Sequence, residues 1–96
     1  MEKILNIKEK ILGLDNKPLT YENEDLSLGK AIAIVLVSSQ KSTDPLRSYV
    51  LGRKFMDAKE ETMELNATDI QYIKEAIGTF QGFNVLVTGQ ILQKFL

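Results

Sequence analysis

The sequence contains no histidine and no cysteine. Without these residues the chain cannot build a Ser-His-Asp or Cys-His nucleophile system, a histidine general base or any of the usual zinc sites. The absence of cysteine also excludes a disulfide framework, which suits a reducing compartment. These absences predict a protein that is not an enzyme.

An excess of charge of either sign is also lacking. Twelve Lys and Arg residues face 13 Asp and Glu residues, so the net charge is -1. Such a balance gives no long-range attraction to phosphate and disfavours nucleic acid as a partner. No apolar run approaches the roughly 20 residues that span a bilayer, and Met1-Glu2-Lys3 does not open a signal peptide. We therefore expect an intracellular protein with no membrane partner.

Metal ligands are limited to carboxylates, several of which lie between residues 57 and 69. The spacing from Asp57 resembles a calcium loop in outline only. Lys59 would stand at the third position, and Thr62 would stand at the sixth, where glycine makes the sharp turn. The sequence therefore predicts no metal and no other cofactor.

The most informative segment that is present is the apolar run over residues 28–39. Between residues 31 and 37 no polar side chain occurs at any angle, so the segment must be covered by protein on every side. Its β-branched residues would suit a buried strand. Ser27 is a good N-cap, however, and the run is long for a strand and ordinary for a helix. We expect a buried central helix.

Residues 1–14 fit two structures. Their apolar residues share one helical face, which favours a helix. The segment Asp15-Asn16-Lys17-Pro18 is a turn signal, and the apolar residues on both sides of it suit a short hairpin instead. Residues 21–25 are polar and predict a solvated loop.

Two or three amphipathic helices are expected in the second half. After a polar loop over residues 40–44, Thr43 or Asp44 caps a helix with Pro45 at its first position. Arg47 and Lys54 share an outer side of this helix, and four apolar residues are expected to face inward. These are Leu46, Tyr49, Val50 and Met56.

The next helix has the clearest amphipathic spacing in the chain, after a short strand candidate at residues 63–65. Asn66 and Asp69 form a variant of the capping box at its start. Its inner face consists of Ile70, Ile73, Ile77 and Phe80. Asn84 then caps a last helix, in which Val85, Leu92 and Phe95 share a side.

The C-terminal part is rich in apolar residues, and Lys94 is the only charged residue from 76 to 96. A small domain cannot easily cover so many apolar side chains, and a large exposed patch usually marks an interaction site. We therefore expect a homo-oligomer, most simply a homodimer, that binds its partner through Phe83, Val87, Ile91 and Phe95. In the alternative, the last helix packs inward and the protein is a monomer.

A second set of candidate residues would bind nucleic acid. Arg47, Arg53 and Lys54 lie near Tyr49 and Phe55 and could form a basic-aromatic patch. In this alternative the protein is a small DNA-binding transcriptional regulator. A solvated helix face is the competing interpretation, because the chain has no basic excess.

Four segments together resemble small phage and prophage proteins of unassigned function. They are Asp15-Asn16-Lys17-Pro18-Leu19, Leu26-Ser27-Leu28-Gly29-Lys30-Ala31-Ile32, Met63-Glu64-Leu65-Asn66-Ala67-Thr68-Asp69 and Val85-Leu86-Val87-Thr88-Gly89-Gln90. The first turn in such proteins is usually Asp-Gly, and Asn16 replaces the glycine while still tolerating a positive φ. The resemblance favours the N-terminal hairpin and carries over no catalytic residue.

The expected architecture is therefore a single α+β domain over residues 1–96 that is mainly helical. It has a small N-terminal β-hairpin, a buried central helix and two or three amphipathic helices, and an all-α fold is the alternative. The resemblance implies a non-enzymatic phage-type accessory or assembly protein that acts through protein-protein interaction. Its partners would be a second copy and a phage or host protein, in the cytoplasm of a host bacterium or in the virion.

Overall fold

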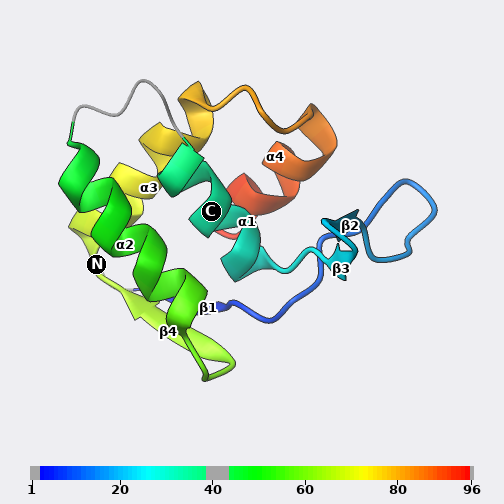
Figure 1. Ribbon diagram of the computed structural model, residues 1–96, viewed down its shortest axis with the longest axis horizontal. Helices are drawn as coiled ribbons and strands as arrows, with labels where there is room; N and C mark the ends of the chain where they lie inside the picture. The colour runs from blue at the N-terminus through cyan, green and yellow to red at the C-terminus, as the bar shows by residue number, and fades with distance from the viewer. Residues whose placement is uncertain (1–2, 39–43, 96) are drawn as a thin grey trace.

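A computed structural model describes residues 3–38 and 44–95. The described chain is an α+β fold that is mainly helical, with small antiparallel sheets, as the sequence predicts (Figure 1). The elements in chain order are β1 (Lys3–Asn6), β2 (Thr20–Tyr21), β3 (Glu24–Asp25), α1 (Leu28–Ser38), α2 (Pro45–Asp57), β4 (Thr62–Leu65), α3 (Ala67–Thr79) and α4 (Val85–Gln93). The expected polar loop falls mainly on residues 40–43, which lie outside the described residues, as do Met1 and Glu2.

Helix α1 is the centre of the fold, which confirms the predicted buried helix, although Val37 near its end was expected to be covered and is 46% exposed. Ser27 caps it, because the Ser27 Oγ accepts a hydrogen bond of 3.2 Å from the Lys30 backbone N–H. The helix packs against α2, α3 and α4. Its fully buried side chains include Ile32, Val35 and Leu36, and Ile34 is partly buried. The β-branched residues are tolerated here because tertiary packing outweighs their weak preference for strands.

The predicted N-terminal β element exists, but its partner is not local. Strand β1 pairs antiparallel with β4, and Lys3 stands opposite Leu65. Leu5, Met63 and Leu65 place one face of this two-stranded sheet in the core. The predicted hairpin lies across Asp15-Asn16-Lys17-Pro18, so β1 is an additional strand outside that hairpin. The strand reaches across the chain because β4 offers it a matching alternation of buried and exposed residues.

The turn itself forms as expected further along the chain. Leu12 and Pro18 make an isolated β-bridge, and the Gly13 N–H donates a hydrogen bond of 2.9 Å to the Lys17 carbonyl. Asn16 has a φ of 62°, the left-handed conformation that asparagine tolerates better than most residues.

Residues 21–25 were expected to be a solvated loop and are instead part of a hairpin. Strands β2 and β3 pair through Tyr21 and Glu24, and the two residues between them, Glu22 and Asn23, have φ values of 52° and 68°. Two successive positive φ values are the signature of a tight hairpin turn. Residues 20–25 are exposed, so the prediction was right about solvation and wrong about structure.

The N-terminal loop and α4 are joined through side chains. Gln90 accepts a hydrogen bond of 2.9 Å from the Leu12 N–H and donates one of 2.7 Å to the Leu12 carbonyl. Lys94 forms an ion pair of 2.8 Å with Glu9. These contacts tie the loop to the last helix. Across the described ranges, no helix has the length and apolar character needed to cross a membrane.

Candidate protein-binding face of α2

Helix α2 begins as the sequence predicts. Pro45 occupies the first turn, and the Asp44 carboxylate accepts a hydrogen bond of 3.1 Å from the Arg47 backbone N–H. Proline has no backbone N–H, so none is left unpaired at this position. The Asp44 side chain caps the helix by accepting from the N–H of Arg47. The start of α2 therefore agrees with the predicted cap.

The inner face of α2 consists of small and large residues that alternate. Ser48, Leu51, Gly52 and Phe55 are buried. Gly52 lies so close to α1 that an added Cβ would be 2.7 Å from Cγ1 of Val37 and 3.4 Å from Cβ of Leu36. Because glycine has no side chain, the two helix backbones approach closely at this point. The inner face is thus already filled by contacts within the chain.

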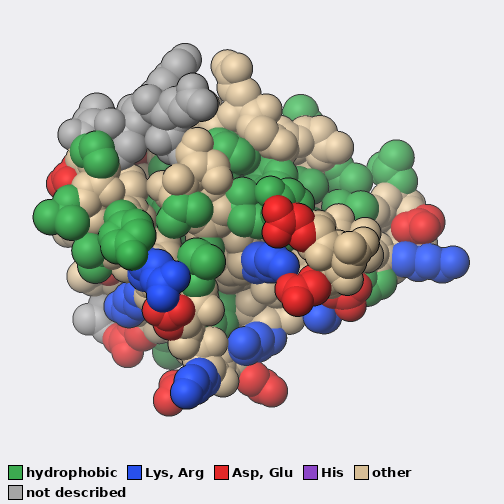
Figure 2. All heavy atoms as spheres, in the orientation of Figure 1, with side chains coloured by type: hydrophobic (Ala, Val, Ile, Leu, Met, Phe, Trp, Pro, Cys, Tyr) green, Lys and Arg blue, Asp and Glu red, His purple; other side chains and the backbone are tan. Residues whose placement is uncertain are grey.

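The opposite side of α2 is apolar and exposed. Leu46 is 72% exposed, Tyr49 and Val50 are each 58% exposed, and Met56 is 55% exposed. With Arg53, these residues follow the spacing of three and four that places side chains on one side of a helix. We call this set of five residues the outer α2 stripe. Figure 2 shows hydrophobic side chains gathered over α2, at the left of the view.

The sequence-based assignment of the faces of α2 was wrong. Leu46, Tyr49, Val50 and Met56 were expected to face inward, because they are the larger apolar residues at helical spacing. The fold instead turns inward the side with Gly52 and Ser48, which permits the close approach to α1. The spacing of Ser48, Leu51, Gly52 and Phe55 was a readable signal for this second face. It was missed because serine and glycine do not count as apolar.

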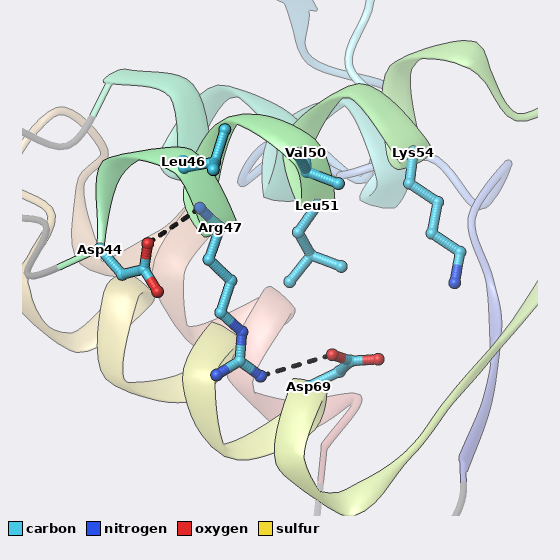
Figure 3. A pocket seen from close by; sticks show the side chains of 7 residues that line it. All are labelled: Asp44, Leu46, Arg47, Val50, Leu51, Lys54 and Asp69. Carbon is cyan, nitrogen blue, oxygen red and sulfur yellow. Dashed lines mark hydrogen bonds and ion pairs between the residues drawn. The ribbon is translucent and has the colours of Figure 1, made fainter.

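A groove of about 420 Å³ runs beside the outer α2 stripe. Leu46, Val50 and Leu51 form its apolar part, and four charged residues from α2 and α3 complete it. These are Asp44, Arg47, Lys54 and Asp69. Figure 3 shows Arg47 and Leu51 reaching from α2 towards α3, where Asp69 lies, with Lys54 at the far end of the groove. The groove therefore combines an apolar surface with a charged edge.

Arg47 is held in place by two neighbours on α3. Its guanidinium lies 3.5 Å from the Asp69 carboxylate and 4.5 Å from the centre of the Tyr72 ring. The Tyr72 hydroxyl donates a hydrogen bond of 3.0 Å to the Asp44 carbonyl and shares another with the Ser48 hydroxyl. An ion pair combined with a cation–π contact restricts the side chain and neutralises its charge.

The other two candidate nucleic-acid residues lie on different sides of α2. Arg53 belongs to the outer stripe, and its guanidinium pairs with Asp57 one turn later at 3.3 Å. Lys54 lines the groove together with Arg47, which confirms that these two residues share a side of the helix. Both arginines thus already have carboxylate partners within the chain. The structure does not join the three cations into one patch.

The predicted C-terminal partner surface is largely buried. Val87, Ile91 and Phe95 belong to the hydrophobic core, and only Phe83 of the four residues is partly exposed. This corrects their assignment as an exposed binding surface and agrees with the alternative in which the last helix packs inward. Of the three residues expected to share a side of that helix, Phe95 is buried, Leu92 is partly buried and Val85 is exposed.

Phe83 instead lines a second pocket, of about 440 Å³, between α3 and α4. Its ring meets that of Phe80 edge to face, with 5.3 Å between the ring centres and 71° between the planes. The residues that line this pocket are all uncharged, and they include Gly78 and Gly89. It therefore offers mainly apolar contact, with Gln81 and Thr88 as its polar side chains.

The carboxylates of the described residues do not gather into a metal-binding cluster. Within those residues, no group of three His, Cys, Asp or Glu side chains lies together in a way that could hold a metal ion. The hydrogen bond and the charge of Lys30 lower the pKa of Glu24, but this pair lies at the β2–β3 hairpin, away from α2. The outer α2 stripe and its groove remain the strongest candidate site.

Comparisons of this chain with protein-family models, with curated proteins and with solved structures found no match.

Proposed function

We propose that this chain is a small non-enzymatic accessory or assembly protein of phage type, and that it acts by binding protein through the outer α2 stripe. The observation that carries this proposal is the exposure of four large apolar side chains on one side of a single helix, each more than half exposed. The phage setting comes from the sequence resemblance alone.

Exposure on this scale favours a binding role over an ordinary surface. Single exposed apolar residues are normal, whereas a contiguous apolar patch on a small soluble protein usually marks an interaction site. The stripe also contains a tyrosine and an arginine, two residue types that are enriched where proteins bind each other. Its groove adds Leu51 and Lys54 at the border, so a partner would meet an apolar centre and a charged rim.

DNA binding has less support. A DNA-binding face needs cations that are free to meet phosphates, and both Arg47 and Arg53 are paired with carboxylates of this chain. The net charge of -1 adds no general attraction. A transcriptional regulator is therefore the competing function in the experiment below.

Photo-crosslinking in bacterial cells tests the proposal. Benzoylphenylalanine placed at Tyr49, on the stripe, should give discrete protein adducts, which mass spectrometry identifies. The same group at Lys74, an exposed position of α3, is the matched control and should give none. A lack of adducts at Tyr49, or equal adducts at both positions, would contradict the proposal.

A DNA titration completes the test. Affinity for duplex DNA that falls steeply with salt, and that is lost when Arg47, Arg53 and Lys54 are changed to Ala together, would favour the regulator instead. We expect weak binding that does not depend on these three residues.

A further inference from the structure

We propose that the outer α2 stripe pairs with the same stripe of a second copy of this chain, with the two α2 helices antiparallel about a two-fold axis at the level of Leu51. This inference rests on the proposed function and specifies one partner for the same face. It differs from the homodimer that the sequence suggested, because that dimer used C-terminal residues that the core now holds.

Two copies of the stripe match each other when their α2 helices are antiparallel, and they do not match when the helices are parallel. Leu46 and Met56 lie five residues before and after Leu51, and Tyr49 and Arg53 lie two residues before and after it. In an antiparallel pair, Leu46 therefore meets Met56 of the second copy, and Tyr49 meets Arg53 of the second copy. Leu46 and Met56 thus gain apolar partners, and each arginine gains an aromatic ring.

Charge favours the antiparallel arrangement over the parallel one. A parallel pair would place Arg53 against Arg53 of the second copy, and like charges at contact repel. The antiparallel pair places each guanidinium over a tyrosine ring, an attractive cation–π contact. The chain already uses this contact on its neighbouring side, where Arg47 lies 4.5 Å from the centre of the Tyr72 ring.

The ion pair on α2 lowers the cost of covering Arg53. Burying an unpaired charge is unfavourable, but the guanidinium of Arg53 lies 3.3 Å from the Asp57 carboxylate of its own helix. At the edge of the stripe, Arg47 is likewise neutralised by Asp69 at 3.5 Å. Lys54 of the second copy would otherwise be repelled by Arg47. It instead approaches the Arg47–Asp69 ion pair, which has no net charge.

The size of the stripe sets the expected strength. Helix α2 has 13 residues, which gives a length of about 20 Å. Stable dimers bury roughly 1,200–2,000 Å² in total, and a single pair of short helices lies at or below the low end of that range. The dimer should therefore be weak, and the monomer should predominate in dilute solution.

Single cysteines test the arrangement cleanly, because the chain has no cysteine of its own. Near the two-fold axis Val50 lies close to Val50 of the second copy, whereas the two copies of Leu46 are about ten helical residues, or 15 Å, apart along the axis. Under mild oxidation Val50→Cys should form a disulfide dimer much faster than Leu46→Cys or Met56→Cys. A mixture of Leu46→Cys and Met56→Cys should form the mixed disulfide. Equal rates for all three single variants would overturn the antiparallel arrangement.

Sedimentation equilibrium on the full chain tests the association itself. The wild type should shift from monomer towards dimer as the concentration rises, and Arg53→Glu should weaken the dimer about tenfold or more. Lys74→Glu is the control, because it makes the same change of charge at an exposed position of α3, outside the outer α2 stripe and its groove, and should retain the dimer. A wild type that stays monomeric, or equal losses in both variants, would overturn self-pairing. Adducts of Tyr49 with another protein would still support the proposed function.

Discussion

Val37 of α1 and Gly52 of α2 touch so closely that a Cβ at Gly52 would lie 2.7 Å from Cγ1 of Val37. Real Cβ atoms almost never approach another heavy atom to this distance, so a larger residue here would have to displace the half-exposed Val37 side chain or α2 itself. The contact decides which side of α2 faces the core, and it therefore decides that the outer α2 stripe faces solvent.

Enlarging Gly52 should destabilise the fold. Gly52→Leu would force α2 away from α1, and overpacking of this kind costs about 1–3 kcal/mol of unfolding free energy. Gly78→Ala is the control, because nothing lies within 4 Å of an added Cβ at that helical position. It should stabilise by about 0.5–1 kcal/mol. Denaturant midpoints measure both changes, and a tolerated Gly52→Leu would contradict the close packing.

Truncating the centre of α1 should be the costliest type of change. Leu36 is fully buried, and Leu36→Ala should remove about 2–5 kcal/mol of the roughly 5–15 kcal/mol that stabilise a domain. Ile34 is only partly buried, so Ile34→Ala should cost less. Equal losses at both positions, measured by urea unfolding, would show that α1 is covered differently from the structure.

Gln90 should be difficult to replace. Its amide satisfies both the N–H and the carbonyl of Leu12, at 2.9 Å and 2.7 Å. Gln90→Leu leaves both backbone groups without this partner and should cost about 1–3 kcal/mol. Gln90→Glu keeps an acceptor for the N–H but sets a carboxylate oxygen against the Leu12 carbonyl, so it should also destabilise the fold. Thermal unfolding of the two variants gives the comparison, and a neutral Gln90→Leu would refute the role of the amide.

The Glu24–Lys30 pair should make stability depend on pH in one direction. The hydrogen bond and charge of Lys30 lower the pKa of Glu24 below its usual 4.5 in the folded chain. A group whose pKa is lowered by folding stabilises above its unfolded pKa and loses that contribution as the pH falls through the folded pKa. The advantage of the wild type over Glu24→Gln should therefore be present at neutral pH and vanish in acid.

Melting curves measured from neutral pH into acid, at low salt, test the prediction. Glu22→Gln lies on the same hairpin, and no ion pair of Glu22 occurs among the described residues, so it is a suitable control. If the advantage over Glu24→Gln grew as the pH fell, the assigned direction would be wrong.

The parts of the fold that local sequence determines were predictable. Ser27, Asp44, Asn66 and Asn84 each cap the helix that follows, and each does so through its own side-chain oxygen. Caps involve residues two or three apart, so the sequence carries the whole signal.

Features that depend on distant segments were not predictable in this way. The pairing of β1 with β4 joins residues about sixty positions apart, and neither strand identifies the other. The orientation of α2 depends on the close approach of Gly52 to Val37, and the only signal for it within α2 is the spacing of Ser48, Leu51, Gly52 and Phe55. The sequence did not predict the outer α2 stripe as a site, because its apolar residues were assigned to the core.

The C-terminal residues show the opposite error. Ile91 and Phe95 were expected at a partner surface because the central helix was thought to fill the core alone. In the structure the core also needs α4, since Val87, Ile91 and Phe95 all pack into it. Counting apolar residues therefore overestimated the exposed surface at this end and underestimated it on α2.

The hydrogen bonds between Gln90 and Leu12 also affect how the chain folds during synthesis. Their partners are separated by 78 residues, and those of the Lys94–Glu9 contact by 85. The ribosome releases the loop around Leu12 long before α4 emerges, and α4 brings Ile91 to the core last. Until α4 emerges, the apolar side chains that it covers stay exposed, and we expect the nascent chain to bind chaperones during this time.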